Sequence, residues 1–306
     1  MTPAIVVVGS LNMDFVVRVA HLPAPGETIL GTQFQTIPGG KGANQAYAAA
    51  RLGANVRMIG RVGYDMFGDQ LKASLAAAGA DVSGVHATRN APTGVALIWV
   101  DAEGQNSIVV ASGANGVLQA LDAHAMRPAF SDARFALFQL ETPIDAVSAA
   151  MRVARECGAV TILDPAPAQA LSREILAHVD ILTPNETEAC ILLGREVSAI
   201  TPEDAPAIAR ELLALGPRAV ILKLGERGCY YASDGQAVYS AACKVTPVDS
   251  TAAGDTFNAA FAVACSLNRE LPDALAYANA AAAVSVTRAG AQSSAPTHED
   301  VLALLR

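Results

Sequence analysis

Residues 247–261 read Pro-Val-Asp-Ser-Thr-Ala-Ala-Gly-Asp-Thr-Phe-Asn-Ala-Ala-Phe, a run of small residues that continues into a helical pattern. Three small residues lead into Asp255, and a helix is predicted to follow because Phe257 and Phe261 lie four residues apart on one face. Small residues let a ligand approach the backbone closely. The first N–H groups of a helix have no partner within it and lie at the positive end of its dipole. The stretch therefore predicts an anion site that suits phosphate.

Asp255 is an unexpected residue beside a phosphate, because a carboxylate repels negative charge. Its position makes sense if Asp255 faces a hydroxyl group that attacks the phosphate while the helical N–H groups stabilise the developing charge. The alternative is that Asp255 caps the helix, which is a common role of aspartate. The residues of this stretch leave both interpretations open.

Composition and charge restrict the possible functions. The chain has 306 residues, of which 52% are hydrophobic, so it can bury a large core and is not disordered. A net charge of -8 argues against binding nucleic acid or an anionic membrane. The negative charge of a phosphorylated ligand must then be balanced locally, by backbone N–H groups and a metal ion.

The five cysteines are scattered without paired spacing. This pattern favours reduced thiols and a cytoplasmic location over a disulfide framework or a zinc site. A buried-strand pattern begins at Ile5, so we expect no cleavable leader before it.

The first predicted strand, residues 5–8, ends in Gly-Ser-Leu-Asn-Met-Asp. Asn12 and Asp14 are two residues apart, so in an extended segment they lie on the same face, opposite Phe15. They could bind a ligand, and the alternative is an ordinary polar turn.

A glycine-rich run, Gly-Gly-Lys-Gly at residues 39–42, precedes a predicted helix over residues 43–52 that Gly53 ends. Three glycines in four residues let the backbone wrap closely around a ligand. The spacing is not that of a P-loop. A generic glycine-rich turn is the alternative interpretation.

Several segments with strand patterns predict a small antiparallel sheet. They are residues 14–19, 28–36, 93–100 and 105–111, the last two forming a hairpin around a four-residue loop. These segments interrupt a βα pattern, as a lid inserted into a core would. We therefore expect one α/β domain over residues 1–306, with a β lid formed by about residues 12–37 and 92–111.

After residue 130 the pattern is a βα alternation, which indicates a mostly parallel central sheet with helices on both faces. In such sheets the ligand lies beyond the carboxyl ends of the strands. The residues that follow the predicted strands, and that we expect along one rim, are Glu141, Asp164, Asn185 and Gly225.

Asn185 and Glu188 have the spacing of a reciprocal helix cap. The two roles can coexist, because Glu188 could also face a hydrated Mg²⁺, an ion that keeps most of its waters and needs few protein carboxylates.

Two motifs together resemble the signatures of the ribokinase-like carbohydrate kinases. They are Gly-Gly-Lys-Gly-Ala-Asn at residues 39–44 and Asp-Ser-Thr-Ala-Ala-Gly-Asp-Thr-Phe-Asn at residues 249–258. The likeness covers nearly the whole chain, and it includes residues 9–14, 184–188 and 287–292. It implies an α/β fold with a small β lid and the transfer of a phosphoryl group from ATP to O5 of D-ribose.

The resemblance also implies a role for each matching residue. Asp255 would be the catalytic base, with Ala252, Ala253 and Gly254 forming the anion hole. The sugar would be bound by Asn12, Asp14, Gly39, Gly40, Lys41, Asn44, Glu141 and Asp255. ATP would lie along Asn185, Lys223, Leu224, Gly225, Glu226, Arg227, Gly228, Gly254 and Asn279. A monovalent cation, usually K⁺, would be held by the loops with Asp249, Thr251, Ser285, Arg288, Gly290 and Ser294.

The resemblance further implies a homodimer that forms lid to lid. The sequence agrees, because an open lid would expose the apolar residues Phe15, Val17, Val95, Leu97 and Trp99. The alternative is that these side chains pack on the core of their own chain.

Two other functions remain possible. One is a related kinase that acts on deoxyribose, another furanose or a nucleoside. The other is a catalytically inactive sugar sensor on the same fold, against which the intact Asp255, Gly254 and Asn185 argue.

Overall fold

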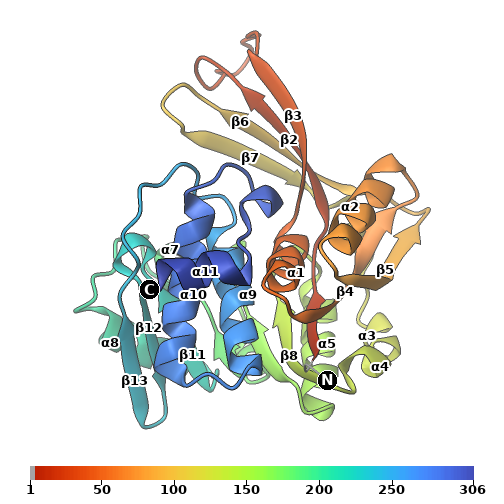
Figure 1. Ribbon diagram of the computed structural model, residues 1–306. Helices are drawn as coiled ribbons and strands as arrows, with labels where there is room; N and C mark the ends of the chain where they lie inside the picture. Colours follow the sequence, from red (N-terminus) through yellow and green to blue (C-terminus); the bar gives the residue numbers. More distant parts are fainter. Residues whose placement is uncertain (1–3) are drawn as a thin grey trace.

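Within residues 4–306, which the computed structural model describes, a nine-stranded sheet runs through the middle of the molecule (Figure 1). Seven neighbouring strands are parallel, and β12 and β13 at one edge are antiparallel. In spatial order the strands are β13 (Gln236–Ser240), β12 (Cys229–Ser233), β11 (Ala219–Lys223), β10 (Ile181–Leu182), β9 (Val160–Leu163), β8 (Ala133–Phe138), β1 (Ala4–Val8), β4 (Asn55–Gly63) and β5 (Asp81–Thr88).

The central strand β1 shows why the sheet is covered on both faces. Ile5 and Val7 belong to one buried cluster, and Val6 and Val8 belong to the other. All four side chains are fully buried. A parallel strand that is apolar on both faces needs a helical layer on each side.

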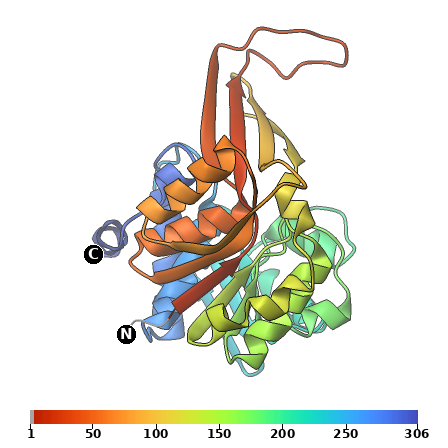
Figure 2. The ribbon, with the colours of Figure 1, turned by 90° about the vertical axis from the view of Figure 1, so that its right-hand side faces the viewer.

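The helices form these two layers (Figures 1 and 2). The layer on the Ile5 side contains α1 (Lys41–Arg51), α2 (Met66–Ala77), α9 (Ala253–Ser266), α10 (Leu271–Val286) and α11 (His298–Leu304). The layer on the Val6 side contains α3 (Asp122–Ala125), α4 (Arg127–Phe130), α5 (Ile144–Glu156), α6 (Arg173–Leu176), α7 (Glu186–Leu192) and α8 (Ala205–Leu213). The part of the chain that the structure describes also contains three 3₁₀ turns, η1 (Gly113–Val117), η2 (Gly225–Arg227) and η3 (Gln292–Ser294).

A second sheet projects from the core and is called the lid sheet below (Figure 2). Its strands, in spatial order, are β3 (Gln33–Gly39), β2 (Asn12–Arg18), β6 (Gly94–Val100) and β7 (Asn106–Ala111). The outer pairings are antiparallel, whereas the central strands β2 and β6 run parallel. The two central strands start side by side, with Asn12 opposite Gly94, because each leaves the core at its base and runs outward.

Much of this architecture follows the sequence pattern. The helix expected over residues 43–52 is α1, and the strand expected over residues 160–163 is β9. The hairpin expected at residues 93–111 is β6–β7. The mostly parallel sheet with helices on both faces and the separate small sheet are confirmed. The domain bounds, residues 1–306 with a lid at 12–37 and 92–111, stay a prediction, and residues 1–3 lie outside the described residues.

Two expectations about strands were wrong. The strand predicted over residues 28–36 is β3, Gln33–Gly39, because residues 20–32 form a long, mostly exposed loop before pairing with β2 begins. The βα alternation after residue 130 is broken by the β12–β13 hairpin, whose Asp234-Gly235 turn is a hairpin signal. The edge strand β5 was not predicted, since it is mostly exposed and lacks a regular apolar pattern.

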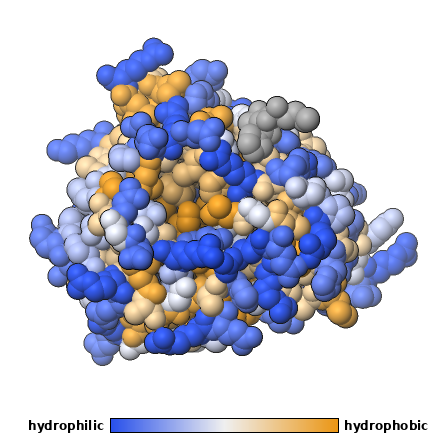
Figure 3. Space-filling model, turned by 90° about the horizontal axis from the view of Figure 1, so that it is seen from below, coloured by the Kyte–Doolittle hydropathy of each residue, from blue (hydrophilic) through white to orange (hydrophobic). Residues whose placement is uncertain are grey.

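The surface away from the lid sheet is mainly hydrophilic, with an apolar patch near its centre (Figure 3). Across residues 4–306, no helix combines the length and the apolar character that crossing a membrane would require.

Candidate active site

The N-terminus of α9 lies at the carboxyl-end rim of the sheet, and its backbone is unusual. Ala252 precedes the helix in the left-handed conformation, with φ of 58°, which is uncommon for a residue other than glycine. No side chain of the described residues caps this helix, and its first hydrogen bond runs from the Thr256 N–H to the Ala252 carbonyl at 2.9 Å. The N–H groups of Gly254 and Asp255 donate to no other group within residues 4–306, so they can bind an anion.

Asp255 does not cap α9, so that alternative is wrong. Its carboxylate instead accepts hydrogen bonds from two side chains of α1, Asn44 Nδ2 and Gln45 Nε2, each at 3.1 Å. The side chain is buried. Burial is the largest influence on its pKa, which rises to about 6 although the charge of Lys41 acts against the rise. A buried carboxylate with a raised pKa suits a general base.

Asn12, Asp14 and Glu141 come together at the base of the lid sheet. Asn12 Nδ2 donates to Glu141 Oε2 at 3.4 Å, and the backbone N–H of Lys41 donates to the same oxygen at 3.1 Å. Burial, together with the charges of Glu141 and Asp255, raises the pKa of Asp14 to about 7. Strand β3 returns beside Asp14, and a Cβ at Gly39 would come within 2.2 Å of Asp14 Oδ2. The close approach therefore explains the glycine, and these residues are not an ordinary polar turn.

Lys41 starts α1, and Gly40 before it has φ of 90°. Burial would lower the pKa of Lys41, but the charges of Asp255, Asp164, Glu141 and Glu188 outweigh this effect and hold its pKa above the ordinary value. Lys41 therefore stays charged among several carboxylates. The glycine-rich run is thus more than a generic turn, since it places a cation next to Asp255.

Asn185 and Glu188 form the reciprocal cap of α7 that their spacing predicts. Glu188 N–H donates to Asn185 Oδ1 at 2.8 Å, and Asn185 N–H donates to Glu188 Oε2 at 2.7 Å. Burial raises the pKa of Glu188, whereas the charge of Lys223 lowers it. Lys223 Nζ donates to Asp164 Oδ1 at 3.0 Å and lies 3.4 Å from the position of a Cβ added at Gly254. The rim beside the helix N-terminus is therefore rich in charge.

The segment after β11 forms η2, which covers Gly225, Glu226 and Arg227. Gly228 follows with φ of 95°, and a Cβ there would lie 2.1 Å from the carbonyl oxygen of Ser240. Arg227 pairs with Glu186. Asn279 of α10 donates to the same Ser240 carbonyl at 3.1 Å, so it holds the residue against which Gly228 packs. Leu224 is fully buried beneath it.

The two loops assigned to a monovalent cation are joined by Asp249. Its carboxylate accepts from Thr251 N–H at 2.9 Å and from Gly290 N–H at 2.8 Å. Burial would raise the pKa of Asp249, but a hydrogen bond from the Thr251 hydroxyl group at 2.6 Å and the two backbone N–H bonds lower it. Ser285 and Ser294 donate their hydroxyl groups to helical carbonyls, and Arg288 pairs with Asp300. Over residues 4–306, no group of three or more His, Cys, Asp and Glu side chains is arranged to hold a metal ion.

Sequence reasoning missed the buried amides behind these residues. Asn115 of η1 donates to Asn12 Oδ1 at 2.7 Å. Gln45 contacts Asp255, and Gln139 donates to Gln45 Oε1 at 2.7 Å. Each of these amides lies outside the motifs recognised in the sequence. Only Gln45 could have been linked to the site, because it directly follows the 39–44 motif.

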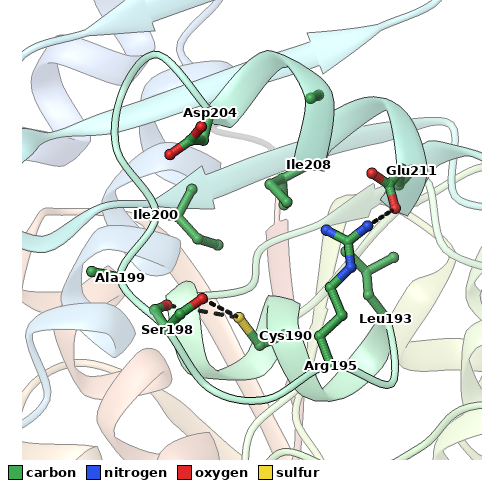
Figure 4. A pocket seen from close by; sticks show the side chains of 10 residues that line it. Cys190, Leu193, Arg195, Ser198, Ala199, Ile200, Asp204, Ile208 and Glu211 are labelled. Atoms are coloured by element: carbon green, nitrogen blue, oxygen red, sulfur yellow. Dashed lines mark hydrogen bonds and ion pairs between the residues drawn. The ribbon is translucent and has the colours of Figure 1, made fainter.

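A separate pocket of about 290 Å³ lies between α7 and α8 (Figure 4). Cys190, Ser198 and Ile200 line it, and an Arg195–Glu211 ion pair lies at its side. None of its lining residues belongs to the site described above.

Comparison with known proteins gives three close likenesses. The model of the pfkB family carbohydrate kinases matches residues 2–298. The chain is 41% identical over 305 residues to the ribokinase of Haemophilus influenzae, covering 100% of this chain and 99% of that protein. It is 35% identical over 296 residues to the deoxyribokinase of Salmonella typhi, covering 96% of each.

Among solved structures, the fold is similar to that of Arabidopsis thaliana ribokinase complexed with ribose and ATP. The TM-score is 0.91 at 35% sequence identity, and the likeness covers 100% of this chain and 99% of that one.

Proposed function

The chain belongs to the pfkB family of carbohydrate kinases, and we propose that it is a ribokinase that transfers the γ-phosphoryl group of ATP to O5 of D-ribose. The observation that carries the proposal is the placement of Asp255. It lies at the uncapped N-terminus of α9 and faces the polar residues at the base of the lid sheet. A base between an anion site and a hydroxyl-binding site suits phosphoryl transfer to a sugar.

The sugar site is proposed to comprise Asn12, Asp14, Asn44 and Glu141 with the Gly39–Lys41 backbone. Asn44 Oδ1 is buried and has no hydrogen-bond partner within the described residues. Buried acceptors normally have a donor, which a sugar hydroxyl would supply. Asp14 can accept from two adjacent hydroxyl groups at once.

In the proposed reaction, ionised Asp255 takes the proton from the O5 hydroxyl group of ribose. The bond from O5 to the γ-phosphorus forms as the bond from that phosphorus to the β-phosphate oxygen breaks, and ADP leaves. Positioning and charge stabilisation dominate such transfers. The free N–H groups of Gly254 and Asp255 would stabilise the charge that develops on the transferring group. ATP would extend from there along Lys223, η2 and Asn279.

The local charge suits Mg²⁺. Asp14, Glu141, Asp164, Glu188 and Asp255 outnumber the two ammonium groups of Lys41 and Lys223 in this region. We propose that Glu188 holds the ion through water. When bound, Mg²⁺ supplies positive charge that neutralises the phosphate oxygens.

We also propose a K⁺ site at the loops that Asp249 joins, with backbone carbonyls as ligands. Because Asp249–Thr251 leads directly into Ala252, an ion there would set the geometry of the anion hole. Replacing K⁺ by tetramethylammonium at constant ionic strength should lower kcat severalfold in a steady-state assay. Equal rates in the two cations would contradict the site.

The proposed dimer joins the lid sheets of two chains. Phe15 and Val95 pack against the chain's own core, but Leu97 and Val109 lie opposite each other and are 41% and 54% exposed. Exposed apolar strands of this kind are usually covered.

We expect sedimentation velocity at micromolar concentration to show a dimer, and Val109→Glu to shift it to monomer, because a charge would then be buried in the interface. Val197→Glu, at an exposed valine outside the lid sheet, is the matched control and should leave the dimer intact. A monomeric wild-type protein would refute the dimer.

Ribose should be preferred over 2-deoxyribose by about tenfold or more in kcat/KM, since an unpaired buried polar group costs about 1–3 kcal/mol and 1.4 kcal/mol is a factor of ten. Asp14→Ala should narrow that preference by reducing ribose use most. Asp69→Ala, at an exposed carboxylate of α2, is the control. If Asp14→Ala keeps the wild-type preference for ribose over 2-deoxyribose, Asp14 does not belong to the sugar site.

A cytoplasmic location is part of the proposal. All five cysteines are free within the described residues, which is the usual state in a reducing compartment.

A further inference from the structure

Gln45 lies at the centre of a buried network that connects Asp255 to the opposite side of the site. Its single side-chain nitrogen donates to Asp255 Oδ1 at 3.1 Å and to Asp164 Oδ2 at 3.2 Å. Its oxygen accepts from Gln139 Nε2 at 2.7 Å. Gln45 and Gln139 are fully buried, and Asp164 is 3% exposed.

The network ends on a cation. Asp164 Oδ1 accepts from Lys223 Nζ at 3.0 Å, while its other oxygen accepts from Gln45. Asp164 therefore has a fixed partner on each oxygen. Lys223 lies next to Gly254, so the chain of contacts runs from the N-terminus of α9 through Asp164 and Gln45 back to Asp255.

A carboxamide has two N–H donors and one carbonyl acceptor, and each is matched here. Gln139 holds the oxygen, which fixes the amide plane and aims one proton at each carboxylate. With Asn44 on its second oxygen, Asp255 is held at both oxygens and cannot rotate. Such supporting contacts keep a reacting group within the narrow geometry that catalysis needs.

We propose that Gln45 is a positioning residue for the base Asp255, and that Asp164, balanced by Lys223, is the second anchor that orients Gln45. The inference rests on the proposed role of Asp255 in phosphoryl transfer. Neither Gln45 nor Asp164 needs to touch the sugar or the nucleotide for this role.

The two residues affect Asp255 in opposite directions. Charged groups that face Asp255 are Lys41 from α1, Asp14 from β2 and Asp164 after β9, with Lys223 beyond Asp164. After burial and Lys41, the charge of Asp164 raises the pKa of Asp255, whereas the hydrogen bonds from Gln45 and Asn44 lower it. Removing the amide donor should therefore raise this pKa, and removing the Asp164 charge should lower it.

The test uses two near-isosteric variants, Gln45→Met and Asp164→Asn, with Thr161→Val as control. Thr161 is buried at the other end of β9, where it binds Asp180, so its variant reports loss of a buried polar contact away from the site. The profile of kcat/KM against pH should rise with the ionisation of Asp255. In Gln45→Met the acid limb should move to higher pH by about half a pH unit or more, and in Asp164→Asn it should move to lower pH.

Gln45→Met should also lower kcat by roughly tenfold or more, because a misplaced base is costly, with the KM for ribose changed much less. Thr161→Val should change thermal stability alone. The proposal is overturned if both variants keep the wild-type pH profile, or if both move it in the same direction.

A second measurement does not depend on turnover. Carbon-13 NMR of aspartate-labelled protein without ligands follows the Asp255 carboxyl group, which Asp255→Asn assigns. We expect the pKa of Asp255 to be higher in Gln45→Met and lower in Asp164→Asn than in the wild-type protein. If the wild-type protein fails to phosphorylate ribose while these shifts appear, the proposed function is wrong and the network stands. If ribose is phosphorylated while the shifts are absent, the network proposal is wrong.

Discussion

Asp255→Asn should lower kcat for ribose phosphorylation by about 10²-fold or more, the usual loss for a general base. Asparagine keeps the shape of the side chain but cannot accept the proton of the O5 hydroxyl group. The hydrogen bonds to Asp255 come from Asn44 and Gln45, and the asparagine oxygen can still accept one of them. Stopped assays of ADP formation would measure the loss.

Ribose binding separates this effect from misfolding. Calorimetry of Asp255→Asn with ribose should give a dissociation constant within a few fold of the wild-type value, because the other hydroxyl-binding residues remain. Asp69→Asn, at an exposed carboxylate, should behave as the wild-type protein. Turnover near the wild-type rate in a folded Asp255→Asn protein would exclude Asp255 as the base.

Lys41→Met is the second change with a large expected effect. Lys41 is the cation that most strongly opposes the rise in the Asp255 pKa, and it also lies near Asp164, Glu141 and Glu188. Without it, excess negative charge would repel the phosphates of ATP and disfavour ionised Asp255. We expect kcat/KM to fall by about 10²-fold, as when one donor to a developing anion is removed.

The direction in which the pH profile of Lys41→Met moves is an independent test of this electrostatic role. The acid limb should move to higher pH, because Asp255 loses the positive charge that favours its ionised form. Arg51→Met, at the exposed C-terminal end of the same helix, is the matched control and should change neither quantity. An acid limb that stays in place or moves to lower pH would contradict the electrostatic role of Lys41.

The fold and the outline of the site were predictable because they depend on local patterns. Short apolar runs that end in polar or glycine residues marked the parallel strands, and their carboxyl ends brought Glu141, Asp164 and Asn185 to one rim. Small residues before a helix marked the N-terminus of α9. The left-handed Ala252 was not predictable, since alanine carries no signal for that conformation.

The supporting residues could not be predicted, because they act over long distances in the sequence. Gln45 reaches Asp164 and Asp255, which are 119 and 210 positions away, and Asn115 reaches Asn12 across 103. Nothing in the local sequence of a single buried amide says which partner it will meet. The parallel pairing of β2 with β6 could not be predicted for the same reason.

Ribokinase activity is tested most directly by a phosphorylation assay of the wild-type protein with ATP, Mg²⁺ and K⁺ on a panel of ribose, 2-deoxyribose, other furanoses and nucleosides. Phosphorus-31 NMR identifies the product and the position of its phosphate. We predict one ADP for each ribose 5-phosphate formed, with ribose the best substrate by kcat/KM. Faster phosphorylation of 2-deoxyribose or a nucleoside, or no transfer to ribose, would show that the protein is not a ribokinase.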